Sequence, residues 1–287
     1  MAWNFGDILD SISAVLPQDA PALIHGDRVI TWGETTRRSN NLGHALIARG
    51  ARPGDKVAFY MRNRPEYVET MAACFKSRLV HVNINYRYKA DEVFYIFDDS
   101  DAQTVVYGSE FRDIIDELKD RLTKVVTFIE VNEDGSAAPF AENYEKIVTG
   151  GDGAPLGLER SPDDLLFIYT GGTTGMPKGV MWRHDDMREA QLTTLRALGP
   201  IPETLPALVE FVKTSGPGPK AMPACPLMHG TGFITAIGNM MSGGCIVTLE
   251  SPTLDAHELW SVVSRRGANS LAIVGDAFAR PMLAALD

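Results

Sequence analysis

The sequence has 287 residues, of which 45% are hydrophobic and 22% are charged, and these proportions are ordinary for a globular protein. The 27 lysines and arginines and the 37 aspartates and glutamates give a formal net charge of −10, which argues against nonspecific binding to nucleic-acid phosphates. The N-terminal residues carry neither the basic stretch nor the apolar core of a signal peptide, and no apolar run is long enough to span a bilayer. We therefore expect a cytoplasmic protein with no nucleic-acid partner and no integral membrane segment.

The first half of the chain alternates between helical and extended periodicity. Gly50 ends the first expected helix and Pro65 opens the second, in positions that these residue types prefer. Strand–helix alternation of this kind predicts an α/β fold with mostly parallel sheets covered by helices. Helices are expected over residues 34–49, 65–78, 91–98 and 110–121, and strands over 56–61, 79–83, 104–107 and 124–130.

Two loose stretches interrupt this pattern. Residues 132–160 are polar and rich in Gly and Ala, with one short helix expected over 141–148. Residues 199–226 contain many prolines, which lack an N–H donor and block helix, so only 207–213 is expected to be helical there. Beyond them, helices are expected over 233–241, 255–266 and 277–286, and strands over 245–250 and 271–274.

The three cysteines, Cys74, Cys225 and Cys245, stand far apart and form no CxxC or Cys/His spacing. No base lies near any of them in the sequence, which disfavours a catalytic thiol. We expect reduced, partly buried side chains, and no metal site formed by the protein.

A segment rich in glycine and threonine, Thr170–Gly179, follows an apolar strand expected over residues 165–170. Glycine permits close approach of the backbone to a polyphosphate, and backbone N–H groups and threonine hydroxyls supply donors. Lys178 adds a mobile positive charge. The alternative is a surface turn, but a chance turn seldom combines four glycines, three threonines, a proline and a lysine directly after a buried strand. We therefore predict a phosphate-binding loop.

The segment differs from the two common nucleotide-binding loops. A Walker-type P-loop needs Gly-Lys followed by Ser or Thr and then a helix, whereas here Pro177 precedes Lys178 and Gly179 follows it. No GxGxxG opens a helix, so a dinucleotide fingerprint is excluded as well. Residues 180–184 resemble a strand, so the loop is expected to join two strands, with Arg183 and His184 on the surface and without a role.

The segment Tyr-Thr-Gly-Gly-Thr-Thr-Gly-Met-Pro-Lys-Gly resembles the signature loop of the AMP-forming acyl-CoA synthetases, within the adenylate-forming enzymes. The family usually has serine where Gly171 stands, and glycine there is compatible with the loop but removes one hydroxyl donor. The resemblance implies that the β- and γ-phosphates of ATP are held by Thr170, Gly171, Gly172, Thr173, Thr174, Gly175 and Lys178.

Other segments extend the resemblance over nearly the whole chain. Residues 31–34, 54–58 and 63–66 fit the family's N-terminal pattern, while His81 stands where a proline is common and implies a less stiff loop. Pro226-Leu227-Met228-His229-Gly230 resembles a motif in which an aromatic residue or histidine borders the acyl pocket, and residues 274–278 resemble a segment beside the acyl and nucleotide sites. The implied catalytic residue is His229, and the implied substrate contacts are His229, Gly230, Val274, Gly275 and Asp276.

The residues by themselves leave alternatives open at two of these positions. His229 could instead be a histidine satisfied in the core or at the edge of a loop. Asp276 could cap a helix that begins near Ala277, since aspartate accepts hydrogen bonds from N–H groups there.

With Asn85-Tyr86-Arg87-Tyr88, the sequence resembles bacterial synthetases that act on fatty or steroid side-chain acids. The implied activity is ATP-dependent conversion of such a carboxylic acid to acyl-AMP and then to acyl-CoA, with ATP, Mg²⁺ and the co-substrate CoA. The sequence leaves the oligomeric state open.

The chain stops about half way through a usual family member. We therefore expect residues 1–287 to form an incomplete large N-terminal domain of the adenylate-forming fold, with sub-regions 1–160 and 161–287 and without the small C-terminal domain. Such a chain is expected to be inactive alone. The alternative is a catalytically inactive, truncated binding module with the same fold.

Overall fold

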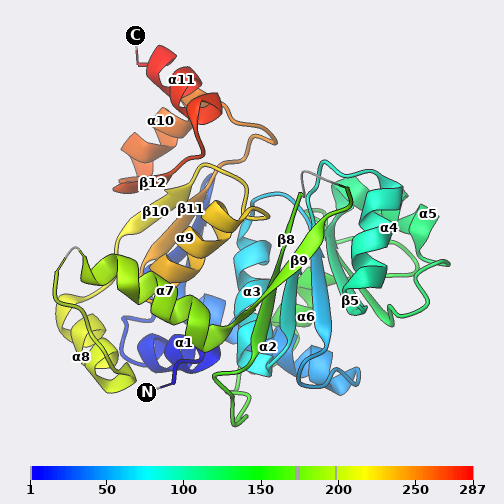
Figure 1. The fold of residues 1–287 in the computed structure, drawn as a ribbon, viewed down its shortest axis with the longest axis horizontal. Helices are drawn as coiled ribbons and strands as arrows, with labels where there is room; N and C mark the ends of the chain where they lie inside the picture. Colours follow the sequence, from blue (N-terminus) through cyan, green and yellow to red (C-terminus); the bar gives the residue numbers. More distant parts are fainter. Residues whose placement is uncertain (1, 172–174, 198, 287) are drawn as a thin grey trace. The chain divides into compact units, whose positions relative to one another are not determined.

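Helices and strands alternate along most of the chain in the computed structural model, which describes residues 2–171, 175–197 and 199–286 (Figure 1). The chain folds as two units, each described here by itself. The first contains Met1–Asp7, Arg37–Met61 and Glu69–Ala197, and the second contains Ile8–Thr36, Arg62–Val68 and Leu198–Asp287. The boundary expected near residue 160 lies inside the first unit, because strands on both sides of it belong to one sheet.

The first unit is built on a seven-stranded sheet with the strand order β7-β6-β5-β3-β4-β8-β9. Neighbouring strands are parallel except for β8 and β9, which form an antiparallel hairpin. The mixed α/β fold with a mostly parallel sheet is therefore confirmed. The strands are β3 Lys56–Tyr60, β4 Val80–Asn83, β5 Ala102–Gly108, β6 Thr127–Val131, β7 Glu142–Asn143, β8 Leu165–Thr170 and β9 Lys178–Arg183.

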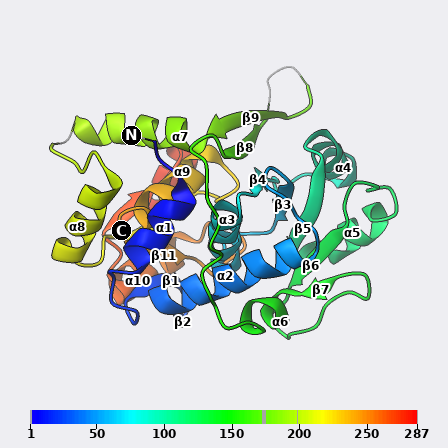
Figure 2. The same ribbon diagram turned by 90° about the horizontal axis from the view of Figure 1, so that it is seen from below.

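Helices cover both faces of this sheet. Figure 2 shows α4 (Ala90–Asp99) and α5 (Arg112–Leu118) on one side of strands β3 to β6, and α6 (Tyr144–Thr149) with the end of α2 (Trp32–Ala48) on the other. Under α4 and α5 lies a continuous apolar core, as the alternation of buried helix and strand residues requires. Its members include Ala58, Val82, Val93, Ile96, Phe97, Val105, Tyr107, Ile115 and Leu118. The other helices that pass through this unit are α3 Pro65–Ser77 and α7 His184–Arg196, with a 3₁₀ turn at Ser109–Phe111.

The second unit is built on a five-stranded sheet with the order β12-β10-β11-β1-β2, parallel except for the β1–β2 hairpin. An apolar core of Ile24, Met222, Val247, Leu259 and Val262 packs between this sheet and α10. The strands are β1 Pro21–His25, β2 Arg28–Thr31, β10 Lys220–Pro223, β11 Cys245–Thr248 and β12 Ser270–Ala272. The remaining helices are α1 Phe5–Ser13, α8 Leu205–Ser215, α9 Gly230–Met240, α10 Ala256–Arg266 and α11 Asp276–Ala284.

Several elements lie where the sequence pattern predicted none, among them β10 and α7. Strand β10 lies inside the proline-rich stretch 199–226, because Pro223 occupies its last position, where a missing N–H removes only the end of the ladder. Helix α7 was not expected because it is polar almost throughout, with Met187 and Leu192 as its buried apolar residues.

Two histidines of the first unit have buried side chains, and one of them was expected on the surface. His184 is buried rather than on the surface, and its ring lies 4.9 Å from that of Phe5 and 4.8 Å from that of Phe75. His81 lies within β4, the strand expected over residues 79–83, with its Nδ1 atom 3.3 Å from the carbonyl oxygen of Phe167. Burial lowers the pKa of His184 to about 4 and that of His81 to about 3, so both rings are neutral at neutral pH.

The three cysteines have buried, reduced side chains. Cys74, Cys225 and Cys245 are unpaired in disulfides and fully buried, and burial raises the pKa of each thiol. Along the described chain, none of the helices combines the length and the apolar character needed to cross a membrane.

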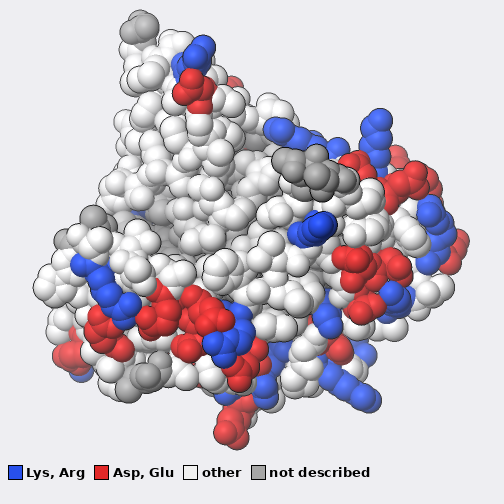
Figure 3. Space-filling model, viewed as in Figure 1, with Lys and Arg blue, Asp and Glu red and all other residues white. Residues whose placement is uncertain are grey.

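Acidic and basic side chains are interspersed on the molecular face seen in Figure 3. Along β9 and α7, for example, Arg183 pairs with Asp163 and Asp186, and Arg196 pairs with Glu189. Opposite charges are therefore paired along this strand and helix of the first unit.

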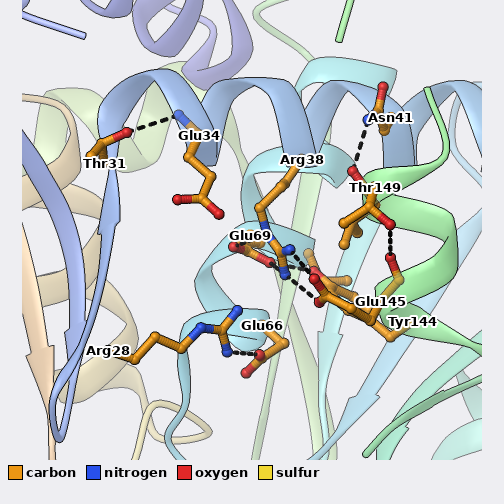
Figure 4. Close-up of polar contacts among 12 residues, drawn as sticks. Arg28, Thr31, Glu34, Arg38, Asn41, Glu66, Glu69, Tyr144, Glu145 and Thr149 are labelled. Carbon is orange, nitrogen blue, oxygen red and sulfur yellow. Dashed lines mark hydrogen bonds and ion pairs between the residues drawn. The ribbon is translucent and has the colours of Figure 1, made fainter. Parts of the chain in front are cut away.

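A buried ionic cluster joins three helices of the first unit (Figure 4). The guanidinium of Arg38 on α2 donates to both carboxylate oxygens of Glu69 on α3, at 2.7 and 3.0 Å, and to both of Glu145 on α6, at 2.7 and 2.9 Å. Tyr144 Oη donates to Glu69 at 3.0 Å. Burial opposes the charge on Arg38, but the hydrogen bonds to Glu145 and Glu69 raise its pKa above the usual value. The cluster therefore holds these helices together through satisfied charges.

Candidate functional site

The predicted phosphate loop connects the two antiparallel strands β8 and β9 at the edge of the seven-stranded sheet. Thr170 and Lys178 pair at its base, so the segment joins two strands as expected. Gly175 has a φ of 148°, a conformation that only glycine adopts readily. Thr170, Gly171, Gly175 and Lys178 are exposed, whereas Gly172, Thr173 and Thr174 lie outside the described residues.

The start of this loop is fixed by a side chain from the neighbouring strand. Asn83, buried at the end of β4, accepts a hydrogen bond from the Tyr169 N–H through Oδ1 at 2.7 Å. Its Nδ2 donates to the carbonyl oxygen of Tyr169 at 3.2 Å. Strands β4 and β8 pair through Val82 and Phe167, so the Asn83 carboxamide extends this pairing to the residue before Thr170. The sequence pattern did not single out Asn83. The one sequence feature that could have indicated it is its position at the end of the strand expected over residues 79–83.

The side chain of Tyr169 leaves room only for glycine at the residue that it faces on β9. Tyr169 Oη donates to Asp99 Oδ2 at 2.7 Å, which holds the ring in place. A Cβ atom on Gly179, the residue paired with Tyr169, would lie 2.8 Å from the ring's Cε2 atom and 2.9 Å from Cζ. Gly179 is therefore required by the close approach of a fixed aromatic ring.

The loop that follows β4 leaves the sheet beside the phosphate loop, because β4 and β8 are parallel neighbours and their carboxyl ends share one edge. Ligands of open α/β sheets bind at this kind of edge. The loop contains Asn85-Tyr86-Arg87-Tyr88, and Tyr88 Oη lies 3.8 Å from the position that a Cβ atom on Gly171 would occupy. The structure thus brings together two segments that are more than 80 residues apart in sequence.

Protein ligands for a metal ion are not clustered here. In residues 2–171, 175–197 and 199–286, no group of three or more His, Cys, Asp or Glu side chains is arranged to hold one. Mg²⁺ commonly binds through substrate phosphates and one or two carboxylates rather than in an all-protein cage. The donors at this edge of the sheet suit phosphate oxygens better than a bare cation.

The second set of predicted residues lies in the second unit. His229 is the N-cap residue of α9, with extended φ and ψ of −100° and 148°, and its side chain is exposed. The interpretation as a core histidine is therefore wrong, whereas the alternative position at the edge of a loop fits this N-cap residue. Gly230 begins the helix, three residues earlier than the sequence pattern predicted.

The segment before His229 is held by the carboxamide of Asn63. Its Oδ1 accepts from the Leu227 N–H at 2.7 Å, and its Nδ2 donates to the carbonyl oxygens of Cys225 at 3.2 Å and Pro223 at 3.4 Å. A Cβ atom on Gly232 would collide with the carbonyl oxygen of Pro226. The main chain that leads to His229 is therefore rigidly placed, by an asparagine that the sequence pattern named only as part of a family-like segment.

Val274, Gly275 and Asp276 follow β12 and leave the second sheet at the same edge as the His229 segment. Strands β10 and β12 are parallel neighbours, and the Cys225 N–H donates to the Ala272 carbonyl oxygen at 3.2 Å just beyond them. Gly275, with a φ of 65°, is the N-cap residue of α11. Asp276 is thus the first helical residue and not the cap, and it pairs with Arg280 at 3.1 Å.

Comparisons with known proteins agree with this architecture. The 3-oxocholest-4-en-26-oate–CoA ligase of Rhodococcus rhodochrous is 35% identical over 300 residues, which cover 100% of this chain and 52% of the relative. The medium/long-chain-fatty-acid–CoA/3-oxocholest-4-en-26-oate–CoA ligase of Mycobacterium marinum is 35% identical, covering 100% of this chain and 53% of the relative. The chain therefore spans about half the length of the curated relatives it matches.

A solved structure and a family model complete the comparison. The N-terminal domain of FACL13 from Mycobacterium tuberculosis superposes with a TM-score of 0.76 at 25% identity, covering 93% of this chain and 62% of that one. The model of the AMP-binding enzymes matches residues 11–286. The chain belongs to the family of AMP-binding enzymes.

Proposed function

We propose that this chain holds the phosphates of ATP and part of the acyl site of an acyl-CoA ligase that activates a fatty or steroid-type carboxylic acid. The observation that carries the proposal is the Gly/Thr/Lys hairpin loop at the carboxyl edge of a parallel sheet, positioned by Asn83 and Tyr169. The family membership and the names of the relatives, which include fatty-acid and steroid-acid ligases, support the same activity.

The proposed reaction has two steps. A carboxylate oxygen of the acid attacks the α-phosphorus of ATP, the bond between the α-phosphorus and its bridging oxygen breaks, and pyrophosphate leaves. The thiol of CoA then attacks the acyl carbon of acyl-AMP, loses its proton, and AMP leaves. Negative charge accumulates on the phosphate oxygens in the first step, so donors already in place lower its barrier. Mg²⁺ would arrive on the phosphates of ATP and neutralise part of their charge.

The residues proposed for these tasks fall into two groups. Backbone N–H groups, hydroxyls and one ammonium would hold the β- and γ-phosphates, and the members are Thr170, Gly171, Gly172, Thr173, Thr174, Gly175 and Lys178. The second group is proposed to border the acid, with His229 at its carboxylate or at the entrance to the acyl pocket. Its members are His229, Gly230, Val274, Gly275 and Asp276. The proposed location is the cytoplasm, where ATP and CoA are available.

A second candidate is a binding module that keeps the fold without turning over substrate. Both candidates require that the loop binds polyphosphate.

ATP–pyrophosphate exchange with a panel of fatty and steroid acids separates the two candidates. We expect no exchange from this chain alone, and exchange from a longer version if the reading frame continues past Asp287. Exchange by the chain alone would exclude the inactive module. Absence of exchange in the longer version, with every acid of the panel, would exclude the ligase.

Direct binding of ATP tests the phosphate loop in either case. Replacement of Lys178 by Met should weaken binding to this chain, because an exposed point charge beside the phosphates is lost. Lys124→Met is the matched control, since Lys124 pairs with Asp98 at 2.9 Å and Asp101 at 2.8 Å on another part of the first unit. Equal affinities of the two variants would contradict the assigned loop.

A further inference from the structure

A groove of about 940 Å³ lies in the first unit between α2, α6 and the loop that joins β6 to β7 (Figure 2). Strand β7 borders it and is one outer strand of the seven-stranded sheet, whereas β9 of the phosphate hairpin is the other. Six strand spacings of about 4.8 Å place roughly 29 Å between these two edges. The groove is therefore separate from the loop Thr170–Gly179.

Small side chains create the space in this groove. Helix α2 contributes Ala45 and Ala48, which lie on the same helical face because they are three residues apart. Alanines at these positions leave a gap that larger residues would fill. The apolar side chains that line the groove include Ala45, Ala48, Ala137, Pro139, Ala141 and Ile147.

Side-chain hydrogen bonds fix the walls at both ends of the groove. At one end, Asn41 Nδ2 donates to the carbonyl oxygen of Val148 at 2.7 Å, and its Oδ1 accepts from the Gly153 N–H at 2.8 Å. At the other end, Arg49 Nε donates to Glu142 Oε1 at 2.5 Å. A ligand would therefore meet walls that are already in place, at little cost in conformational entropy.

The groove carries one uncompensated positive charge. Lys146 on α6 is exposed, and among the described side chains its ammonium pairs with no carboxylate. The other charged side chains of the lining, Arg49 and Glu142, neutralise each other. Glu145, next to Lys146, is bound by Arg38. A ligand with a single negative charge matches this arrangement, whereas a dianion would be repelled by the two nearby carboxylates.

We propose that the groove between α2 and α6 binds an amphipathic monocarboxylate. The Lys146 ammonium donates to the carboxylate oxygens, and the alanine-rich walls cover the apolar body of the ligand. Apolar walls with a few polar groups are the usual composition of a small-molecule site. The groove does not depend on ATP binding, and it is distinct from His229 and the 274–276 segment, which belong to the second unit.

Titration of the ¹⁵N-labelled chain with sodium octanoate tests the proposal. We expect saturable shifts of the amide signals of Gly135, Gly150 and Gly151, which line the groove. Lys146→Met should weaken octanoate binding by about tenfold, because a hydrogen bond to a charged group is lost. Octan-1-ol, which has no charge, should bind equally to the wild type and to this variant. Ala48→Leu should weaken both ligands, because the larger side chain fills the groove.

Lys124→Met is the matched control, since Lys124 pairs with Asp98 and Asp101 away from the groove, and it should bind octanoate as the wild type does. Absence of shifts at the three glycines would overturn the proposal. Octanoate affinity that neither Lys146→Met nor Ala48→Leu reduces would overturn it as well. Tighter binding of octyl phosphate than of octanoate would exclude a site for a single negative charge.

Discussion

The side chain of Asn83 makes two hydrogen bonds with the main chain of Tyr169, accepting from its N–H at 2.7 Å and donating to its carbonyl oxygen at 3.2 Å. The carboxamide thus continues the hydrogen bonding between β4 and β8 up to the residue before Thr170, where the phosphate loop begins. Its loss would leave two buried main-chain groups without these partners, and the origin of the loop would be less well fixed.

Asn83→Ala should therefore reduce the free energy of unfolding by about 1–3 kcal/mol, measured by chemical denaturation. Tripolyphosphate affinity should fall as well, because the donors of the loop are less well preorganised. Asn132→Ala is the control, since Asn132 donates to Ser136 Oγ in an exposed turn and its removal should cost less than about 0.5 kcal/mol. Equal stabilities of the two variants would show that the Asn83 hydrogen bonds contribute nothing net.

Gly179→Ala should be destabilising in the same hairpin where Gly171→Ala is tolerated. The added methyl group would meet the Tyr169 ring at 2.8 Å, and the ring is held by its hydrogen bond to Asp99. Overpacking of this kind costs about 1–3 kcal/mol, whereas the open site at Gly171 should change stability by less than about 0.5 kcal/mol. Thermal denaturation of both variants measures the difference, and a reversed order would show that Tyr169 moves freely.

Arg38→Ala should be one of the most destabilising single changes in the first unit. It would leave the fully buried carboxylate of Glu69 without its main partner, and breaking a buried ion pair on one side costs about 3–5 kcal/mol. Arg49→Ala removes an arginine from its more exposed pair with Glu142 and should cost about 1 kcal/mol or less.

Glu145→Gln extends this comparison if Arg38→Ala fails to fold, because Glu145 is half-exposed and its loss leaves the Arg38–Glu69 pair in place. The loss in the free energy of unfolding caused by Glu145→Gln, measured with denaturant, should lie between the losses caused by the two arginine variants. A loss from Arg49→Ala as large as that from Arg38→Ala would contradict the distinction between buried and exposed pairs.

Stability should fall as the pH is lowered below about 6.5, in part because of His184. Burial lowers the pKa of His184 to about 4 in the folded chain, whereas the unfolded side chain has a pKa of about 6.5. Between these values the unfolded chain binds more protons, so stability from this group is fully present above the unfolded pKa and is lost as the pH falls toward 4.

His184→Phe should make this pH dependence shallower, because a phenylalanine among the rings of Phe5 and Phe75 has no proton to bind. Unfolding free energies measured at pH 7 and pH 4.5 for this variant, the wild type and His257→Gln provide the comparison. His257 is exposed, and His257→Gln controls for the loss of a histidine elsewhere in the chain. An unchanged slope in His184→Phe would show that His184 is not the group responsible.

Much of the fold follows from local patterns in the sequence. The helix expected over 34–49 is α2 (Trp32–Ala48), the strand expected over 165–170 is β8, and Pro65 opens α3 as proline at a first helical position should. Periodicity indicates these elements because each has an apolar face or core that any α/β packing would bury. The polar helix α7 and the proline-ended strand β10 lack that signal, so neither was predicted.

The residues of the phosphate loop were indicated by their composition, but the residues that position the loop were not. Asn83, Tyr88 and Asp99 lie on β4, the following loop and α4, and nothing in their immediate sequence context connects them to Thr170 or Gly179. The burial of His184 was hidden for the same reason, since a histidine after a strand has no local sign of the aromatic rings that enclose it.

The sequence by itself determined the α/β class, the hairpin position of the loop Thr170–Gly179 and the family to which the chain belongs, because these depend on residue types at short spacing. The tertiary structure alone decided which distant side chains support that loop. Strand order places β4 beside β8, so Asn83 at the end of β4 reaches Tyr169, and Tyr88 in the following loop reaches Gly171, more than 80 residues later. Contacts of this kind arise from the pairing of parallel strands, which joins residues that local periodicity cannot relate.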